Sequence, residues 1–261
     1  MLKRLGQSLA WRIFPWANLS LHLNSGLRVC LMNRADFRIL QEIFIEQSYT
    51  PFLSLLPEVR TWVDLGCNCG LFSLFLENWA RERRWPEPRR ALLIEPNRYA
   101  LRPLYASLRA SKLTESFQVM EGVVTGHETE AEFFESKSTY RSSVFKRESR
   151  ENPRRVPVIN LDQATTGWPA VDLVKIDIEG GEKLVVTHWM AWLRKARFLL
   201  VEWHEPEMGG RDLAAAFAKA GFKLLIAQAA SHLPPQPGEP LDAKIGTGLW
   251  VNEAMPMQSL K

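Results

Sequence analysis

The chain has 261 residues, of which 46% are hydrophobic and 24% are charged, with a formal net charge of +4 and three cysteines. A chain of this length and composition buries a large core without disulfides or a structural metal. This excludes a disordered chain, a collagen-like fibre and a small secreted module held by disulfides. Three cysteines suit a reducing compartment, and no apolar run approaches the roughly 20 residues of a membrane span. We expect a cytoplasmic protein.

An N-terminal appendage, residues 1–55, is expected to contain a helix and a β-hairpin. Within residues 1–18, apolar side chains recur near one helical face at Leu2, Leu5, Leu9 and Ile13. Such a helix packs on the domain or on a second subunit of a homodimer, or it lies on a membrane surface, and these alternatives stay open. Residues 19–31 alternate polar and apolar side chains around an Asn-Ser-Gly turn, which predicts the hairpin.

From about residue 59 onward, short apolar runs alternate with longer helical stretches, which is the pattern of βαβ units around a parallel sheet. The predicted strands are Arg60–Gly66, Arg90–Glu95, Phe117–Glu121, Val171–Asp177, Arg197–Trp203 and Phe222–Ala227. Several of them are apolar on both faces, as expected for strands covered by helices on two sides. A last edge strand is predicted over Thr247–Asn252.

Helices are expected between these strands. One follows Gly70, and a second has Pro103 in its first turn, where the missing N–H of proline does no harm. A third follows Gly181, and a fourth covers Asp212–Ala220 and stops at the glycine after it. The alternation of strand and helix favours an open α/β sheet.

Residues 129–160 interrupt this alternation and are interpreted as a β-insertion. Two strand-like pieces, Glu132–Glu135 and Val156–Leu161, flank a basic loop. Between residues 137 and 155 the chain carries seven basic residues and two acidic ones. The segment is either a solvated loop or a flap that faces an anionic substrate.

The first predicted strand ends in Gly-Cys-Asn-Cys-Gly, residues 66–70, just before a helix. Glycines let the backbone approach a ligand closely, and the free N–H groups of a helix N-terminus attract an anion. A dinucleotide-binding turn would need a third glycine at position 73, where this chain has serine. The turn therefore predicts a site for the carboxylate of a small zwitterionic ligand, with a structural tight turn as the alternative. Zinc is disfavoured, because Cys67 and Cys69 have no second ligand pair.

Acidic residues end the second and third predicted strands. Glu95 ends the second strand, where a carboxylate can accept hydrogen bonds from both hydroxyls of a ribose. Glu121 and Gly122 end the third strand on the same edge of the sheet, beside the expected position of a base.

The fourth and fifth predicted strands bring charged residues to that edge. Lys175, Asp177 and Glu179 are spaced by two, so an extended strand places them on one face. Burying charges is costly unless they pair or bind a ligand, so this cluster favours a site over a structural ion pair. His204 ends the fifth strand beside it and is a candidate base. Asp177, Glu179 and His204 could also hold a divalent metal, although their spacing is not diagnostic and no metal is assigned.

Taken together, these motifs resemble the FkbM-type family of S-adenosylmethionine-dependent methyltransferases over about residues 27–205. The matching stretches are Val63–Ser73, Ile94–Asn97, Pro157–Asp162, Val171–Glu182 and Leu200–His204. The string Lys-Ile-Asp-Ile-Glu-Gly-Gly-Glu, which begins at Lys175, is the most specific of them. The sequence departs from the family pattern at Cys67, where alanine is common, and at Ser107 and Ser111, where asparagines are common.

The resemblance implies a Rossmann-like class I methyltransferase domain over residues 56–261, with S-adenosyl-L-methionine as its cofactor. The implied fold is a mostly parallel seven-stranded sheet with helices on both faces and an antiparallel last strand. By position, the implied cofactor-binding residues are Asp64, Gly66, Asn68 and Gly70 for the methionine part, Glu95 for the ribose, and Glu121 with Gly122 near the adenine. Asp177 and Glu179 are implied to face the transferred methyl group.

We therefore expect O-methylation of a hydroxyl on a sugar or a small secondary metabolite. A hydroxyl is a poor nucleophile until its proton is shared with a base; Asp177 is the first candidate and His204 the second, with Lys175 and Glu179 tuning the charge. N- or C-methylation of a small molecule is the alternative within enzymes. A non-catalytic nucleic-acid-binding module is the alternative outside them, although no nucleic-acid motif is present. The basic segment predicts an anionic acceptor.

Overall fold

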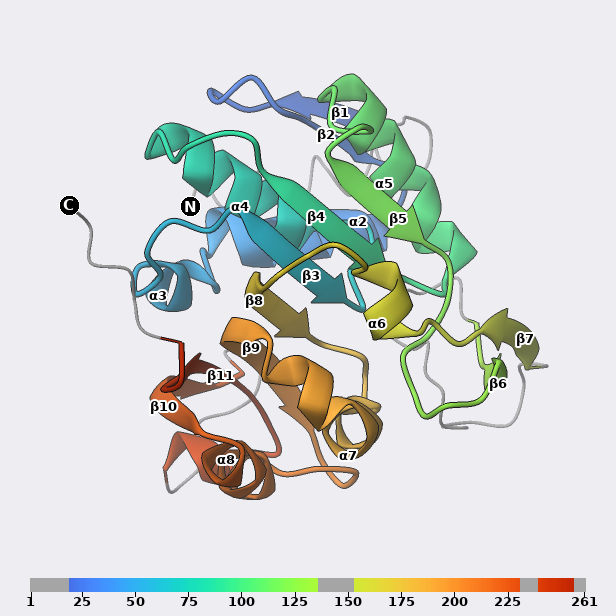
Figure 1. Ribbon diagram of the computed structural model, residues 1–261. Coiled ribbons are helices and arrows are strands. Elements are labelled where there is room, and N and C mark those ends of the chain that lie inside the picture. Colours follow the sequence, from blue (N-terminus) through green and yellow to red (C-terminus); the bar gives the residue numbers. More distant parts are fainter. Residues whose placement is uncertain (1–18, 136–152, 231–238, 256–261) are drawn as a thin grey trace.

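The computed structural model describes residues 19–135, 153–230 and 239–255. The expected helix within residues 1–18 and the basic segment over residues 137–152 lie outside the described residues. The described residues form one central seven-stranded sheet and two small two-stranded sheets (Figure 1). None of the helices in these ranges is both long and apolar enough to cross a membrane.

The central sheet has the strand order β10-β11-β9-β8-β3-β4-β5. Its strands are β3 (Thr61–Leu65), β4 (Arg90–Ile94), β5 (Phe117–Met120), β8 (Val171–Ile176), β9 (Ala196–His204), β10 (Phe222–Ala229) and β11 (Ile245–Asn252). Each adjacent pair in the series β9-β8-β3-β4-β5 is parallel. β11 runs antiparallel to both β9 and β10. The mostly parallel seven-stranded sheet with an antiparallel last strand is confirmed.

The last strand is not at the edge of the sheet, so that expectation was wrong. β11 is inserted between β9 and β10 and pairs with both. Leu249 and Trp250, on its two faces, are both buried, which an edge strand would not require. Gly246 allows this close packing, because a Cβ there would lie 2.3 Å from the Trp203 ring. The edges are β5 and β10.

Helices cover both faces of the sheet, as expected (Figure 1). One hydrophobic cluster joins α4 (Leu71–Glu82) and α5 (Arg98–Ala110) to one face. A second cluster joins α7 (Glu182–Leu193) and α8 (Gly210–Lys219), with the short α6 (Leu161–Ala164), to the other face. The alternating side chains of β3 divide between them, since Trp62 belongs to the first cluster and Val63 to the second.

Pro103 lies inside α5 and not in its first turn, which corrects the expected start of this helix. The helix begins at Arg98, because the Asn97 side chain accepts a hydrogen bond from Tyr99 N at 2.9 Å and caps the N-terminus. A proline in the sixth position removes one backbone hydrogen bond. Capping by asparagine, and not the position of the proline, sets the start of the helix.

The N-terminal part packs onto the sheet through α5. β1 (Leu19–His22) and β2 (Arg28–Leu31) form the expected antiparallel hairpin. Ser107 Oγ accepts a hydrogen bond from Cys30 N at 2.8 Å, and Ser111 Oγ accepts one from Arg28 N at 2.9 Å. The two serines that replace the family's asparagines therefore fasten the hairpin to α5.

A helical segment leads from the hairpin to the sheet. It consists of α2 (Arg34–Leu40), a π-helical turn η1 (Gln41–Ile45) and α3 (Thr50–Leu53). Asn33 caps α2 by accepting hydrogen bonds from Ala35 N and Asp36 N. The sequence analysis did not predict this segment, which brings Ile39, Glu42 and Ile43 to the site described below.

The β-insertion is present as an antiparallel ribbon of β6 (Glu130–Phe133) and β7 (Arg154–Pro157), each about two residues earlier than expected. Arg154 connects the ribbon to the sheet, since its guanidinium donates to Pro96 O at 2.6 Å and to Glu121 Oε1 at 2.8 Å. Figure 1 shows the ribbon beyond the carboxyl ends of β4 and β5. A 3-10 turn, η3 (Pro240–Asp242), precedes β11.

Candidate functional site

The turn after β3 packs its backbone directly against the backbone that follows β8. Gly66 N and Cys67 N both donate to Ile94 O, at 3.0 and 3.1 Å, which ties the ends of β3 and β4 together. Gly66 has φ +74°, and a Cβ on it would lie 1.9 Å from Asp177 O. Only glycine fits here, because the turn passes directly over the chain that leaves β8.

Glu95 is held between the turn and the start of α5. Its Oε2 accepts a hydrogen bond from Asn68 N and its Oε1 accepts one from Asn97 N, both at 2.8 Å. Asn68 adopts the left-handed region at φ +50°, and its side chain accepts from Cys69 N. The carboxylate is thus fixed in place, and each oxygen keeps a lone pair for a ligand.

Burial raises the pKa of Glu95 to about 7, and the negative charge of Asp64 adds to this. The hydrogen bonds from Asn97 N and Asn68 N and the charge of Lys175 act in the opposite direction. A ligand that donates hydrogen bonds to the ionised carboxylate will therefore compete with a proton near neutral pH.

A first cavity opens beside Glu95 at the carboxyl ends of β3, β4 and β5. Its wall includes Gly66, Asn68, Glu95, Gly122, Phe133, Asp177, Ile178 and Glu179. Phe133 comes from the β6–β7 ribbon, so the insertion contributes directly to this wall. Glu121 does not line the cavity and instead pairs with Arg98 and Arg154, at 2.8 Å each. Gly122 lines it, as expected.

Asp64 and Gly70 lie below the site. Neither residue lines the first cavity or the second cavity that is described below. Asp64 is fully buried, and its Oδ2 accepts a hydrogen bond from Ser73 Oγ at 2.7 Å. Gly70 begins α4, and a Cβ on it would lie 2.3 Å from a Leu104 side-chain carbon. Both residues support the turn from beneath.

Lys175 and Asp177 form a buried ion pair at the end of β8. Lys175 Nζ donates to Asp177 Oδ2 at 3.1 Å and lies 3.5 Å from Asp64 Oδ1. Burial alone would lower the pKa of Lys175, but the carboxylates of Asp177 and Asp64, with the Tyr49 hydroxyl, hold it well above its usual value. Lys175 is therefore a fixed cation that orients the Asp177 carboxylate.

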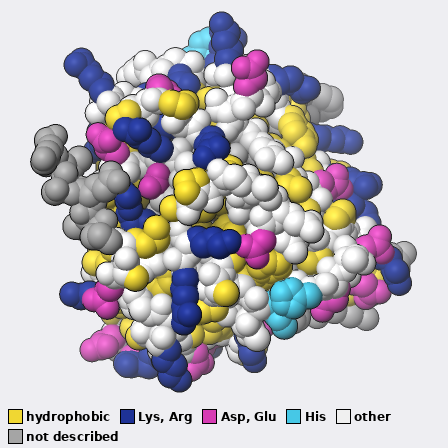
Figure 2. Space-filling view, viewed as in Figure 1, with side chains coloured by type: hydrophobic (Ala, Val, Ile, Leu, Met, Phe, Trp, Pro, Cys, Tyr) yellow, Lys and Arg dark blue, Asp and Glu magenta, His cyan; other side chains and the backbone are white. Residues whose placement is uncertain are grey.

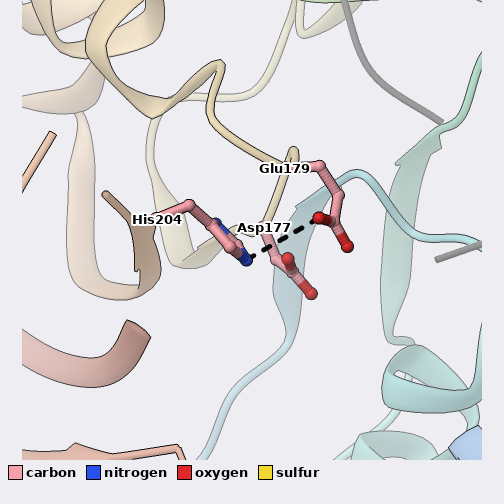
Figure 3. A group of neighbouring side chains, drawn as sticks. All are labelled: Asp177, Glu179 and His204. Atoms are coloured by element: carbon pink, nitrogen blue, oxygen red, sulfur yellow. Dashed lines mark ion pairs between the residues drawn. The ribbon is translucent and has the colours of Figure 1, made fainter. Parts of the chain in front are cut away.

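His204 faces Asp177 and Glu179 from the end of β9 (Figure 3). Its Nδ1 lies 3.1 Å from Glu182 Oε1, which also accepts hydrogen bonds from Ile178 N and Gly180 N. Its Nε2 lies 3.9 Å from Glu179 Oε2. The predicted grouping of these side chains is thus present in space.

The environment of His204 keeps its imidazole charged. Burial on its own would lower the pKa of His204, but the hydrogen bond and charge of Glu182, with the charges of Asp177 and Glu202, raise it to about 10. A protonated imidazole donates hydrogen bonds and cannot accept a proton. His204 is therefore poorly suited to act as a base in this state.

Asp177, Glu179 and His204 also satisfy the geometric requirement for a metal site. One potential ligand atom from each lies within 4.8 Å of the others. Glu182 would then orient the imidazole from behind, as carboxylates do at many histidine metal sites.

A second cavity, of about 340 Å³, lies on the other side of the Gly66 turn. This volume is in the range of small-molecule sites. Its polar wall consists of Glu42, Tyr49, Asn68, Lys175, Asp177, Glu179, Glu202 and His204, and its apolar wall includes Ile39, Leu71 and Phe72. Gly66, Asn68, Asp177 and Glu179 line both cavities, so Asp177 stands where the two meet.

The sequence analysis missed Glu42, Tyr49, Glu182, Glu202 and Phe133. Glu202 could have been found, because it lies two residues before His204 and so on the same face of β9. Glu42 belongs to a π-helical turn, a feature that is common at functional sites but has no simple sequence pattern.

Comparison with known proteins gives one family match. The family model described as "Methyltransferase FkbM domain" matches residues 72–224, which is more than half of the chain. No curated protein sequence gives a significant match.

Solved structures of low sequence identity also match. A protein of the NADB-Rossmann superfamily from Streptococcus agalactiae is 11% identical, with a TM-score of 0.45, and the match covers 78% of this chain and 67% of that one. Aeropyrum pernix fibrillarin with natively bound S-adenosyl-L-methionine is 11% identical, with a TM-score of 0.47, and the match covers 90% of this chain and 83% of that one.

Proposed function

The chain belongs to the family of methyltransferases with an FkbM domain, which use S-adenosyl-L-methionine, and on that premise we propose that it methylates a hydroxyl of a sugar or another small molecule. The observation that carries this proposal is the position of Asp177, which lines both cavities and so lies between a cofactor in the first and an acceptor in the second. A carboxylate at such a junction can take the proton of an accepting hydroxyl.

The residues that line the first cavity suit the ribose and the base of the cofactor. Glu95 presents a fixed carboxylate with free lone pairs, which suits the two hydroxyls of a ribose. The apolar side chains of Ile94, Val124 and Phe133 suit a flat base. When bound, S-adenosylmethionine supplies a methyl group on a positively charged sulfur, which departs as a neutral thioether.

Within this arrangement Asp177 is the base. Lys175 holds Asp177 Oδ2 at 3.1 Å, while Oδ1 accepts no hydrogen bond from any residue in the described ranges. Asp177 would receive the hydroxyl proton at this free oxygen as the acceptor oxygen attacks the methyl carbon. Holding donor and acceptor on two sides of one turn supplies the alignment that a displacement needs.

An acceptor screen tests the proposed reaction. The protein is incubated with S-adenosylmethionine and a panel of sugars and hydroxylated small molecules, and the products are analysed by mass spectrometry and NMR. We expect a methyl ether and an equal amount of S-adenosylhomocysteine. A product methylated on nitrogen or carbon would contradict the proposal while leaving the methyltransferase assignment intact.

Cofactor binding is expected to release a proton near pH 7. The ribose hydroxyls favour ionised Glu95, whose pKa of about 7 without ligand reflects its burial. The affinity for S-adenosylhomocysteine should therefore fall about tenfold for each pH unit below the free-protein pKa and level off above it. Calorimetry in two buffers with different ionisation enthalpies measures this proton release, which Glu95→Ala should abolish. An affinity that does not change between pH 6 and pH 8 would contradict the assigned role of Glu95.

The face of the molecule drawn in Figure 2 does not favour the nucleic-acid-binding alternative. Figure 2 shows lysine and arginine side chains spread over this face of the molecule and separated by acidic and uncharged surface. A nucleic-acid footprint would gather them into a patch or stripe.

For the site of action we propose a reducing compartment such as the cytoplasm. All three cysteines are free thiols, and Cys67 and Cys69 are buried within the turn that follows β3. Burial raises the pKa of both thiols well above the usual value. Protonated, buried thiols of this kind are structural.

A further inference from the structure

The second cavity carries more negative than positive charge. Four carboxylates and two cations line it, namely Glu42, Asp177, Glu179 and Glu202 against Lys175 and His204. Two further carboxylates behind the wall share these cations. Asp64 Oδ1 lies 3.5 Å from Lys175 Nζ, and Glu182 Oε1 lies 3.1 Å from His204 Nδ1. When all of these carboxyl groups are ionised, the two cations do not neutralise the wall, and the single positive charge of a bound sulfonium still leaves an excess of negative charge.

Two of the four carboxylates belong to the part of the second cavity that the first cavity does not share. Asp177 and Glu179 lie at the end of the second cavity that meets the first. Glu42 and Glu202 lie at its other end, where they also line a third depression that continues toward Gln228. The second cavity thus has a reacting end at Asp177 and an acidic end at Glu42 and Glu202. His204 lies between them, since its Nε2 is 3.9 Å from Glu179 Oε2 and 3.7 Å from Glu202 Oε1.

The two glutamates at the acidic end have few partners. Glu42 forms no ion pair with any residue in the described parts of the chain. Glu202 Oε1 lies 3.7 Å from His204 Nε2, and the charge of Lys175 acts on both carboxyl groups. Burial and the negative charge of Asp177 raise the pKa of both carboxyl groups. A bound cation would favour their ionised forms.

A buried polar group points to a ligand at the same end. Tyr49 lines both the second cavity and the third depression, and its side chain is 6% exposed. Its hydroxyl makes no hydrogen bond with any residue that the structure describes. The hydroxyl faces the open cavity, so a ligand bound there can form a hydrogen bond with it.

We propose, on the basis of the function proposed above, that the acceptor is an amino sugar or a similar cationic polyol, whose ammonium group binds between Glu42 and Glu202. Tyr49 accepts a further hydrogen bond from the ammonium group, and the hydroxyl to be methylated meets Asp177 at the reacting end. The amino group is recognised and not methylated, because Glu42 and Glu202 keep it protonated, and an ammonium nitrogen has no lone pair with which to attack the methyl group.

This assignment differs from the anionic acceptor predicted from the basic segment. That prediction rests on residues 137–155, most of which lie outside the described residues. A carboxylate or phosphate in the second cavity would meet Glu42 and Glu202 and be repelled. The two predictions therefore make opposite statements about which sugars bind.

The test compares sugars that share one ring and differ in charge. Glucosamine, glucose and glucuronate are titrated separately by calorimetry into the protein saturated with S-adenosylhomocysteine. We expect glucosamine to bind at least about tenfold more tightly than glucose, which corresponds to one charge-assisted hydrogen bond, and glucuronate to bind most weakly. Equal binding of glucosamine and glucose, including no measurable binding of either, overturns the proposal, as does tighter binding of glucuronate.

Glutamate-to-glutamine variants separate charge from shape. Glu42→Gln and Glu202→Gln should each weaken glucosamine binding several-fold more than they weaken glucose binding, and so reduce the preference for glucosamine. Glu46→Gln is the matched control, because Glu46 is exposed and lies four residues after Glu42. A preference that survives both cavity substitutions would overturn the proposal.

Two further outcomes are informative. If Mg²⁺ alone binds the protein and removes the preference for glucosamine, the negative charge serves a metal ion and the proposal is wrong. If S-adenosylhomocysteine itself does not bind, the proposed function fails first. Binding of S-adenosylhomocysteine without selectivity among the three sugars refutes the cationic acceptor alone.

Discussion

Replacing Asp177 with asparagine should lower turnover about a thousandfold, the range expected for loss of a general base, while the affinity for S-adenosylmethionine stays within about threefold. Asparagine keeps the size of the side chain and its approach to Lys175 Nζ, which lies 3.1 Å from Asp177 Oδ2, but it cannot accept the hydroxyl proton. Single-turnover rates and calorimetry on the same preparation measure the two effects separately.

The matched control is Asp212→Asn, because Asp212 is exposed in the first turn of α8 and lines neither cavity. This variant should retain the full rate. If Asp177→Asn loses cofactor affinity and rate in equal measure, Asp177 is a cofactor or folding residue. If it retains most of the rate, no base is needed, and N- or C-methylation becomes the better assignment.

Replacing Glu77 with glutamine should lower the free energy of unfolding by about 3 kcal/mol, as expected when one partner of a buried ion pair is removed. Glu77, in α4, accepts hydrogen bonds from Arg89 Nε and Nη2, at 2.8 Å each, and from Arg81 Nε at 2.6 Å. The side chains of Glu77 and Arg89 are both 2% exposed. Glutamine would remove the buried counter-charge of the guanidinium and leave Arg89 paired only with the exposed Glu87, whose Oε1 lies 2.5 Å from Arg89 Nη2.

Urea unfolding at constant m-value measures this loss. Glu82→Gln is the control, since Glu82 ends the same helix in an exposed position, and its free energy of unfolding should change by less than about 0.5 kcal/mol. A loss below about 1 kcal/mol for Glu77→Gln would show that the cluster of Glu77 with two arginines contributes little to stability.

The sequence predicted the elements that are determined by the pattern of residues within a short stretch of the chain. Strands such as Ala91–Ile94 are apolar on both faces and can only be buried between two helical layers. Gly66 was recognised as part of the Gly-Cys-Asn-Cys-Gly turn. The structure adds the physical reason for the glycine, which is a positive φ and a close approach to Asp177 O. The placement of Glu95 at the end of β4 followed from the order of the strands alone.

The predictions that failed depend on contacts between distant segments. After α8 the chain forms β10 at the edge of the sheet and leaves a gap beside β9, which β11 then fills. No residue pattern within Thr247–Asn252 predicts this order. The start of α5 was inferred from Pro103, although Asn97 caps the helix.

For the site, the sequence predicted which charged residues gather but not how deep each one lies. Asp64 occupies a strand position that could face the ligand or the core, and its partner Ser73, on α4, places it in the core. The acidic end of the second cavity was missed, since Glu42 and Glu202 come from elements far apart in the chain.

The most direct test of the account is a crystal structure of the protein with S-adenosylhomocysteine. The account predicts the nucleoside in the first cavity, with both ribose hydroxyls at about 2.7 Å from the Glu95 carboxylate, and the sulfur directed toward Asp177 and the second cavity. A nucleoside bound elsewhere, or one whose ribose does not touch Glu95, would contradict it.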